Sequence, residues 1–205
     1  MSENANKSEL GLSQLGRSGI QNPAPLGEEI GLHSIMHIAS GKFPGQNYVN
    51  VKYNIVVQGE WRLARGNTGG VTHCACVSTN ADELYFNYTT DFELQTTSLC
   101  KFPCVLFTVY GMDLLGRSVV LGYGQTPLAQ VDGVCNREID VFKPKSHTWL
   151  SEIIGKLKGT PTELINPKET VVNNEGREFI RTEAVGSLSI EFDTKRIKWA
   201  ENGFQ

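Results

Sequence analysis

The sequence predicts an all-β protein, an antiparallel β-sandwich of about eight strands with one inserted amphipathic helix. Three observations support this fold class. Apolar and polar residues alternate with a period of two in several segments, and 21 glycines and 8 prolines provide turns between such segments. Hydrophobic residues also make up 40% of the 205 residues, which is enough to fill one core.

The first half of the chain carries strands with one polar and one apolar face. In residues 49–57, valine, tyrosine and isoleucine alternate with Asn50, Lys52 and Asn54, as in a strand with one face in water. A glycine-rich excursion over residues 59–70 interrupts this pattern. The strands expected before residue 100 cover residues 34–39, 49–57, 71–78 and 88–96.

The strongest strand signal is CVLFTVY at residues 104–110, an almost continuous run of β-branched and aromatic residues. A run of this kind belongs near the middle of a sheet, where both faces are covered. A turn at residues 111–116 then sends the chain back. The strands expected after it cover residues 117–125, 137–142 and 187–193.

One segment has helical rather than strand periodicity. Ser146 is a suitable N-cap, and Gly159 followed by Pro161 ends the helix. Its apolar residues recur on one side at Trp149, Leu150, Ile153, Ile154 and Leu157. Two interpretations stay open: the helix packs on the sandwich, or its basic, tryptophan-bearing surface contacts a membrane.

The bulk charge and the motif content argue against several function classes. The net charge is −3 and the basic residues are spread along the chain, so no nucleic-acid partner is expected. No phosphate-binding loop, dinucleotide fingerprint or nucleophile elbow is present. We therefore expect a binding protein rather than an enzyme, without a cofactor.

The five cysteines are an odd number in a chain that shows no export signal, so reduced thiols and a cytoplasmic location are expected. The alternative is a zinc site. It would join Cys74 and Cys76 to Cys100 and Cys104, although zinc sites favour wider spacing than Cys-x-Cys. We expect no metal.

The chain divides into one domain with two appendages. Residues 1–32 are rich in glycine, serine, asparagine and proline without periodicity, and are expected to form a flexible N-terminal extension. The domain is expected over residues 33–198, with a short C-terminal tail at residues 199–205.

Three segments resemble one known family. They are VYGMDLLGRSVVLGYGQTPL from residue 109, FKPKSHTWLSEIIGKLKG from residue 142, and NPKETVVNNEGREFIRTEAVGSLSIEF from residue 166. The first has the layout of a C2 domain hairpin. Together, in this order and spacing, they resemble the B9 domain family of ciliary proteins from about His33 to Lys195.

This resemblance implies a C2-like fold and the role of a scaffold subunit of the Meckel syndrome complex at the ciliary transition zone and basal body. Its implied partners are a second short B9 protein, the larger Meckel syndrome protein with a B9 domain, and transmembrane transition-zone proteins. The assembly would support cilium formation and control which membrane proteins enter the cilium. The alternative function is a calcium-independent peripheral lipid-binding module.

The resemblance also locates a degenerate calcium site. Calcium needs six to eight oxygen ligands, which C2 domains supply as carboxylates from two loops. Here Gly111 and Asp113 occupy the Asp-x-Asp positions, and Gln46 stands where calcium-binding relatives carry aspartate. Asp113 alone cannot hold the ion, so we expect it to be a turn residue that accepts backbone hydrogen bonds.

Two surfaces are candidates for binding. Arg177, Glu178 and Arg181 suit a polar protein interface, as does Tyr123 if its strand lies at a sheet edge. An anionic membrane surface is the other candidate partner, through basic residues that surround one tryptophan. These possible lipid-facing residues are Lys143, Lys145, Trp149, Lys156 and Lys158.

Overall fold

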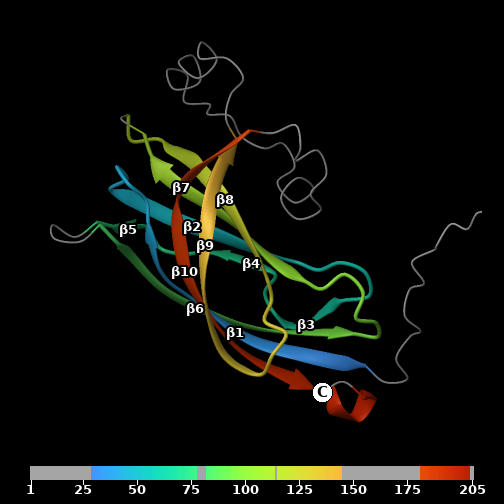
Figure 1. Ribbon diagram of the computed structural model, residues 1–205. Helices are drawn as coiled ribbons and strands as arrows, with labels where there is room; N and C mark the ends of the chain where they lie inside the picture. Colours follow the sequence, from blue (N-terminus) through green and yellow to red (C-terminus); the bar gives the residue numbers. More distant parts are fainter. Residues whose placement is uncertain (1–28, 78–81, 114, 145–180, 204–205) are drawn as a thin grey trace, which may run out of the picture.

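The described part of the chain forms ten antiparallel strands, arranged in two layers around one core (Figure 1). The computed structural model describes residues 29–77, 82–113, 115–144 and 181–203. All strand pairings are antiparallel, and the sheet curls so that its two halves face each other. The predicted all-β antiparallel fold is confirmed.

The first layer has the strand order β3-β6-β1-β10-β9, and the second has the order β8-β7-β2-β4 with β5 added to β2. The first layer contains β3 (Arg62–Gly66), β6 (Leu84–Thr96), β1 (Ile30–Lys42), β10 (Thr182–Ile197) and β9 (Gly133–Pro144). The second contains β8 (Ser118–Pro127), β7 (Cys104–Met112), β2 (Tyr48–Val56), β4 (Gly69–Val71) and β5 (Ala75–Cys76).

The two layers join at a corner between β8 and β9. Among the described residues, the strand register across this corner consists of the pair Tyr123 and Phe142. The glycines on either side of Tyr123 permit this close approach. A Cβ on Gly122 would lie 2.7 Å from the Phe142 carbonyl oxygen, and one on Gly124 would lie 3.3 Å from the Asp140 carbonyl oxygen. The Gly-Tyr-Gly sequence therefore fixes where the sheet folds over.

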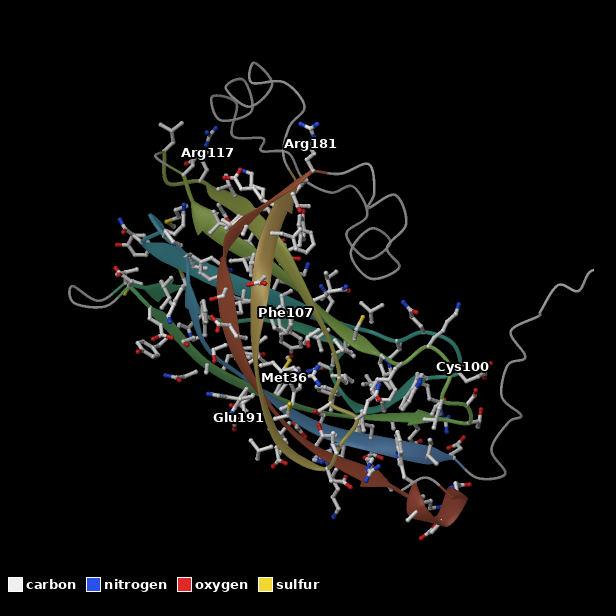
Figure 2. All side chains as sticks on the ribbon, viewed as in Figure 1. Met36, Cys100, Phe107, Arg117, Arg181 and Glu191 are labelled. Atoms are coloured by element: carbon white, nitrogen blue, oxygen red, sulfur yellow. The ribbon has the colours of Figure 1, made fainter. Side chains whose placement is uncertain are left out.

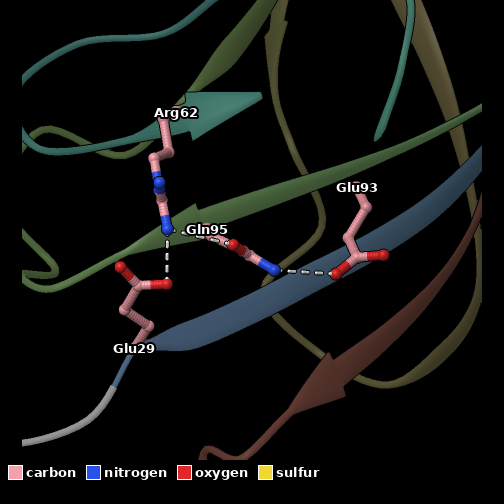
Figure 3. A network of polar contacts seen from close by, with 4 residues as sticks. All are labelled: Glu29, Arg62, Glu93 and Gln95. Atoms are coloured by element: carbon pink, nitrogen blue, oxygen red, sulfur yellow. Dashed lines mark hydrogen bonds and ion pairs between the residues drawn. The ribbon is translucent and has the colours of Figure 1, made fainter. Parts of the chain in front are cut away.

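The outer edges of the sheet are short and are linked to each other. Strand β3 pairs with β6 in one layer, and β4, a few residues later in the chain, pairs with β2 in the other. Arg62 of β3 also contacts Glu29, which precedes β1, and lies 3.4 Å from the side-chain oxygen of Gln95 (Figure 3). These side chains are half exposed, so their ion pair adds little stability, but a short edge strand that carries charge, as β3 does, resists pairing with other chains.

The core lies between the layers and follows the alternation of each strand. Met36 of β1 and Phe107 of β7 are fully buried in one cluster (Figure 2). Phe192 of β10 is fully buried in the same cluster. Strand β7 is buried along most of its length and lies between β2 and β8, which confirms the interior position predicted for CVLFTVY.

The structure changes several predicted boundaries. Strand β1 begins at Ile30, and Ile30 and Leu32 are buried, so the domain starts before the predicted residue 33. Trp199, assigned to the tail, donates a hydrogen bond of 2.8 Å to the Gly31 carbonyl and is buried. A short 3-10 turn at Ala200–Asn202 follows it.

Strands β3 and β4 lie in the excursion where no strand was predicted, and only the two-residue β5 and the end of β4 fall in the predicted strand 71–78. Glycine-rich sequence hides such short strands, because their pairing depends on tertiary contacts. The predicted helix over residues 146–158 lies outside the described residues.

Candidate functional site at the loop end of the sandwich

Asp113 lies in the loop that joins β7 to β8, at the position of the expected calcium ligand. Its Oδ1 accepts hydrogen bonds from the backbone amides of Leu115 and Arg117, both at 2.9 Å. Its Oδ2 accepts one from Arg117 Nε at 2.7 Å. The backbone closes the same loop, because the Gly116 amide donates to the Asp113 carbonyl at 3.0 Å. Asp113 is thus a turn residue, as predicted.

These contacts stabilise the charged form of Asp113. The amide of Arg117, its guanidinium group and the amide of Leu115 lower the pKa of the Asp113 carboxyl group. Both carboxylate oxygens already accept hydrogen bonds within the loop. A cation at this position would have to compete with Arg117 for the same carboxylate.

Gly111 and Gln46, the other two positions of the degenerate site, are neighbours in the structure. Gly111 pairs with Val49 of β2, and a Cβ at residue 111 would lie 2.8 Å from Gln46 Oε1 and 2.7 Å from Leu121 Cδ1. The structure therefore brings the expected loops together and fills the space between them with uncharged groups. Calcium independence stays a prediction.

The zinc alternative is wrong for these cysteines. Cys76 pairs with Tyr48 at the start of β2, whereas Cys104 pairs with Val56 at its end. Eight residues of strand separate the two positions by about 26 Å, so the two cysteine pairs cannot share one ion. Among the described residues, no three histidine, cysteine, aspartate or glutamate side chains lie close enough to hold a metal.

All five cysteines are free thiols. Cys104 is buried, and this burial raises the pKa of its thiol to about 11. It is therefore a protonated, unreactive core residue at neutral pH.

The partner-binding residues predicted from the sequence fall in different places. Arg181 is exposed where the chain enters β10 (Figure 2). Arg177 and Glu178 lie outside the described residues. The prediction for Tyr123 is corrected: only 3% of it is exposed, and its strand lies between β7 and β9 rather than at an edge.

Of the candidate lipid-facing residues, Lys143 lies near the end of β9 and is half-buried. The other four, Lys145, Trp149, Lys156 and Lys158, lie outside the described residues.

The outer face of the first layer carries an acidic surface. Strand register places Asp91, Ile35, Asp193 and Val134 side by side across β6, β1, β10 and β9. The next row on this face contains Thr89, His37, Glu191 and Asn136, and Figure 2 shows Glu191 at the outer surface. A third row holds Glu93, His33 and the exposed Lys195, and Arg65 of β3 lies 3.8 Å from Asp91, so two cations share this face with the four carboxylates. We call these three rows the acidic face.

The comparison with protein families decides the identity of the domain. A family model described as "B9-C2: Ciliary basal body-associated, B9 protein" matches residues 32–195. This chain belongs to the B9 family. The resemblance seen in its sequence motifs is confirmed, and the family's C2 designation agrees with the observed fold.

Similar B9 proteins come from several animals. B9 domain-containing protein 1 of Xenopus laevis is 29% identical over 164 residues, covering 78% of this chain and 82% of that protein. The Mus musculus protein of the same name is also 29% identical, covering 78% and 80%. B9 domain-containing protein 2 of Danio rerio is 24% identical, covering 78% and 90%.

A solved C2 domain of plant Extended Synaptotagmin 1 is also similar to this chain. It has 11% sequence identity and a TM-score of 0.43, and the match covers 84% of this chain and 96% of that domain. In the described part of this B9 domain, no helix is long and apolar enough to cross a membrane.

Two features of this B9 domain escaped the sequence analysis. The partner of Asp113 is Arg117, and the sequence Asp-x-x-Gly-Arg offers a signal for it, because a turn of this length brings the two side chains together. The acidic face had only a partial signal. Its carboxylates alternate on β6 and β10, but which strands lie next to each other depends on pairings far apart in the chain.

Proposed function

We propose that this B9 protein is a non-enzymatic scaffold subunit of the ciliary transition-zone Meckel syndrome complex. In this role it binds other B9 proteins, supports cilium assembly and helps to control the composition of the ciliary membrane. The observation that carries the proposal is the family match over residues 32–195, whose description is ciliary basal body-associated.

The acidic face supports a protein partner of opposite charge. Asp91 on β6 and Glu191 and Asp193 on β10 are at least partly exposed on either side of β1, near the exposed apolar side chains of Ile35 and Val134. An interface of this kind combines an apolar centre with a charged surround. Charge complementarity raises the association rate and excludes partners of the wrong sign. A B9 domain or another subunit with a lysine- and arginine-rich surface fits this face.

Purification from ciliated cells tests the proposal. A tagged chain, captured at near-physiological salt, is expected to bring down a second B9 protein in a stoichiometric complex. The control for an intact fold is the same tagged chain with Trp199→Ala. This substitution removes the hydrogen bond to Gly31 and so loosens the first residues of β1. Recovery of the folded wild-type chain without any B9 protein would contradict the scaffold role.

The alternative, a calcium-independent lipid-binding module, makes a different prediction. Liposome flotation would then require anionic lipid and no calcium. It would also be lost on Lys156→Glu and Lys158→Glu substitution, because each lysine near an anionic surface contributes about 1 kcal/mol. A chain that floats in this way without a B9 partner favours the lipid function over the scaffold function.

A further inference from the structure

The second layer has an apolar cluster on its outer face, separate from the main core. Leu106, Val120 and Tyr123 form its centre, and Val56, Tyr110 and Phe142 pack against them. Their chain neighbours Phe107 and Leu121 belong to the main core. Because successive residues of a strand point to opposite faces, the cluster points away from the space between the layers. We call it the outer cluster.

The outer cluster is covered, unlike comparable positions nearby. Leu106, Val120 and Tyr123 are only 1%, 8% and 3% exposed. At the end of the same face, Tyr48 is 50% exposed and Met112 48% exposed. Lys52, in the middle of the same face on β2, is also exposed. Neighbours in the same sheet flank Leu106 but do not lie over it, so another segment must cover the cluster.

The two points at which the undescribed connection joins the sheet indicate which segment this is. Residues 145–180 connect β9 to β10, where Pro144 and Thr182 pair. Phe142, a member of the outer cluster, pairs with Tyr123 and lies two residues before Pro144. Both ends of the connection therefore lie beside the cluster. Antiparallel neighbours need only two to five connecting residues, so this connection is far longer than the pairing requires.

The sequence of the connection has the complementary surface. Between Ser146 and Lys158 its apolar residues recur at helical spacing, which predicts one apolar side. We propose that residues 146–158 pack on the outer cluster through these residues and form an interface within the chain. The apolar residues are Trp149, Leu150, Ile153, Ile154 and Leu157.

This inference concerns the isolated domain and does not depend on the proposed function. It answers the question that the sequence left open for the helix. With Trp149 against the sheet, the segment has no free tryptophan for a membrane, and Tyr123 is not available to a partner. Only the flanking lysines and the opposite side of the segment would face outward.

Hydroxyl-radical footprinting of the full-length chain, alone in solution, tests the inference. The variant Trp149→Ala/Ile153→Ala/Leu157→Ala is compared with Ser151→Ala/Glu152→Ala, which changes the opposite side of the same segment. We expect oxidation of Tyr123 to be slow in the wild type and control. In the triple variant it should rise several-fold, towards the rate of the exposed Tyr48. Tyr53, buried in the main core, reports whether each variant is folded.

A second measurement covers the case in which the triple variant unfolds. In Leu106→Ala/Tyr123→Ala, tryptic cleavage after Lys156 and Lys158 should become several-fold faster than in the wild type. Two results would overturn the proposal: oxidation of wild-type Tyr123 at the rate of Tyr48, or protection of Tyr123 that the triple variant leaves intact. Protection that appears only with added anionic vesicles or a second B9 protein would assign the outer cluster to that partner instead.

Discussion

Asp113 shows how one side chain holds the loop between β7 and β8. Its two oxygens accept hydrogen bonds from two backbone amides and from the Arg117 guanidinium group. Such an arrangement satisfies donors that a tight loop otherwise leaves to water. The carboxylate therefore acts as part of the protein frame.

The Asp113→Asn variant should lower the thermal unfolding midpoint at neutral pH. Asparagine keeps one oxygen acceptor but loses the charge that pairs with Arg117. Because folding lowers the pKa of Asp113, its stabilisation is complete above the ordinary carboxyl pKa and is lost as pH falls through the folded-state pKa. Thermal melts at neutral and strongly acidic pH should show the gap between wild type and variant closing with acid. A gap of constant size would contradict this role.

Calcium titration of the wild-type chain by calorimetry should show no binding at micromolar concentration. Restoring a carboxylate with Gly111→Asp should not create a site. The new side chain would overlap Leu121 and Gln46, at a cost of about 1–3 kcal/mol in unfolding free energy. Urea unfolding measures this cost. Tight calcium binding by either protein would refute the account of this loop.

The corner between β8 and β9 is the element on which the two-layer arrangement depends. Tyr123 and Phe142 form the backbone register pair between the two strands, Arg137 of β9 donates a hydrogen bond to Thr126 of β8, and the glycines beside Tyr123 allow the backbones to approach. A larger residue at either glycine would push the layers apart. The two glycines beside Tyr123, which are neighbours in the sequence, therefore determine how the two layers are arranged.

Gly122→Ala should destabilise the protein more than Gly124→Ala. The first Cβ would lie 2.7 Å from a backbone oxygen that cannot move independently, and the second would lie 3.3 Å from its nearest atom. We expect a loss of about 1–3 kcal/mol for Gly122→Ala and a clearly smaller loss for Gly124→Ala. Urea unfolding of both variants makes the comparison. Equal losses would indicate that backbone approach at Gly122 is not limiting.

At the level of elements, the sequence predicted the long strands well and the short ones poorly. Period-two alternation identified β2, β6 and β10, because each has one face on the core and one largely in solvent. Strands β3, β4 and β5 carry little apolar sequence, and only their pairing with longer strands makes them strands.

The candidate site was predicted only where its chemistry is local. The turn role of Asp113 follows from residues close to it in sequence. The burial of Tyr123 and the acidic face depend on which distant strands are neighbours, and no sequence period reports this. The motif resemblance, by contrast, identified the family because it spans several segments in a fixed order.

On the scale of the whole molecule, the two layers present different outer surfaces. The first carries the acidic face, and the second carries the outer cluster. The two outer faces of the domain therefore differ in chemistry. Such a difference suits a subunit that must bind its partners in one orientation.

Reversing charge on the acidic face should slow association with a B9 partner. Glu191→Lys/Asp193→Lys places two cations among the carboxylates, and the association rate should fall on the order of tenfold at low salt. The control Glu60→Lys/Asp82→Lys makes the same change in net charge at exposed positions in other parts of the chain. Surface plasmon resonance at two salt concentrations measures the rates. Equal effects of both variants would remove the acidic face from the interface.

Localisation of the full-length chain in ciliated cells tests the central claim most directly. A fluorescently tagged chain, expressed at the natural level, is imaged together with a basal-body marker. The scaffold account predicts a focus at the base of each cilium that coincides with a second B9 protein and disperses when that protein is removed. An even distribution through the cytosol, with no focus at the ciliary base, would contradict it.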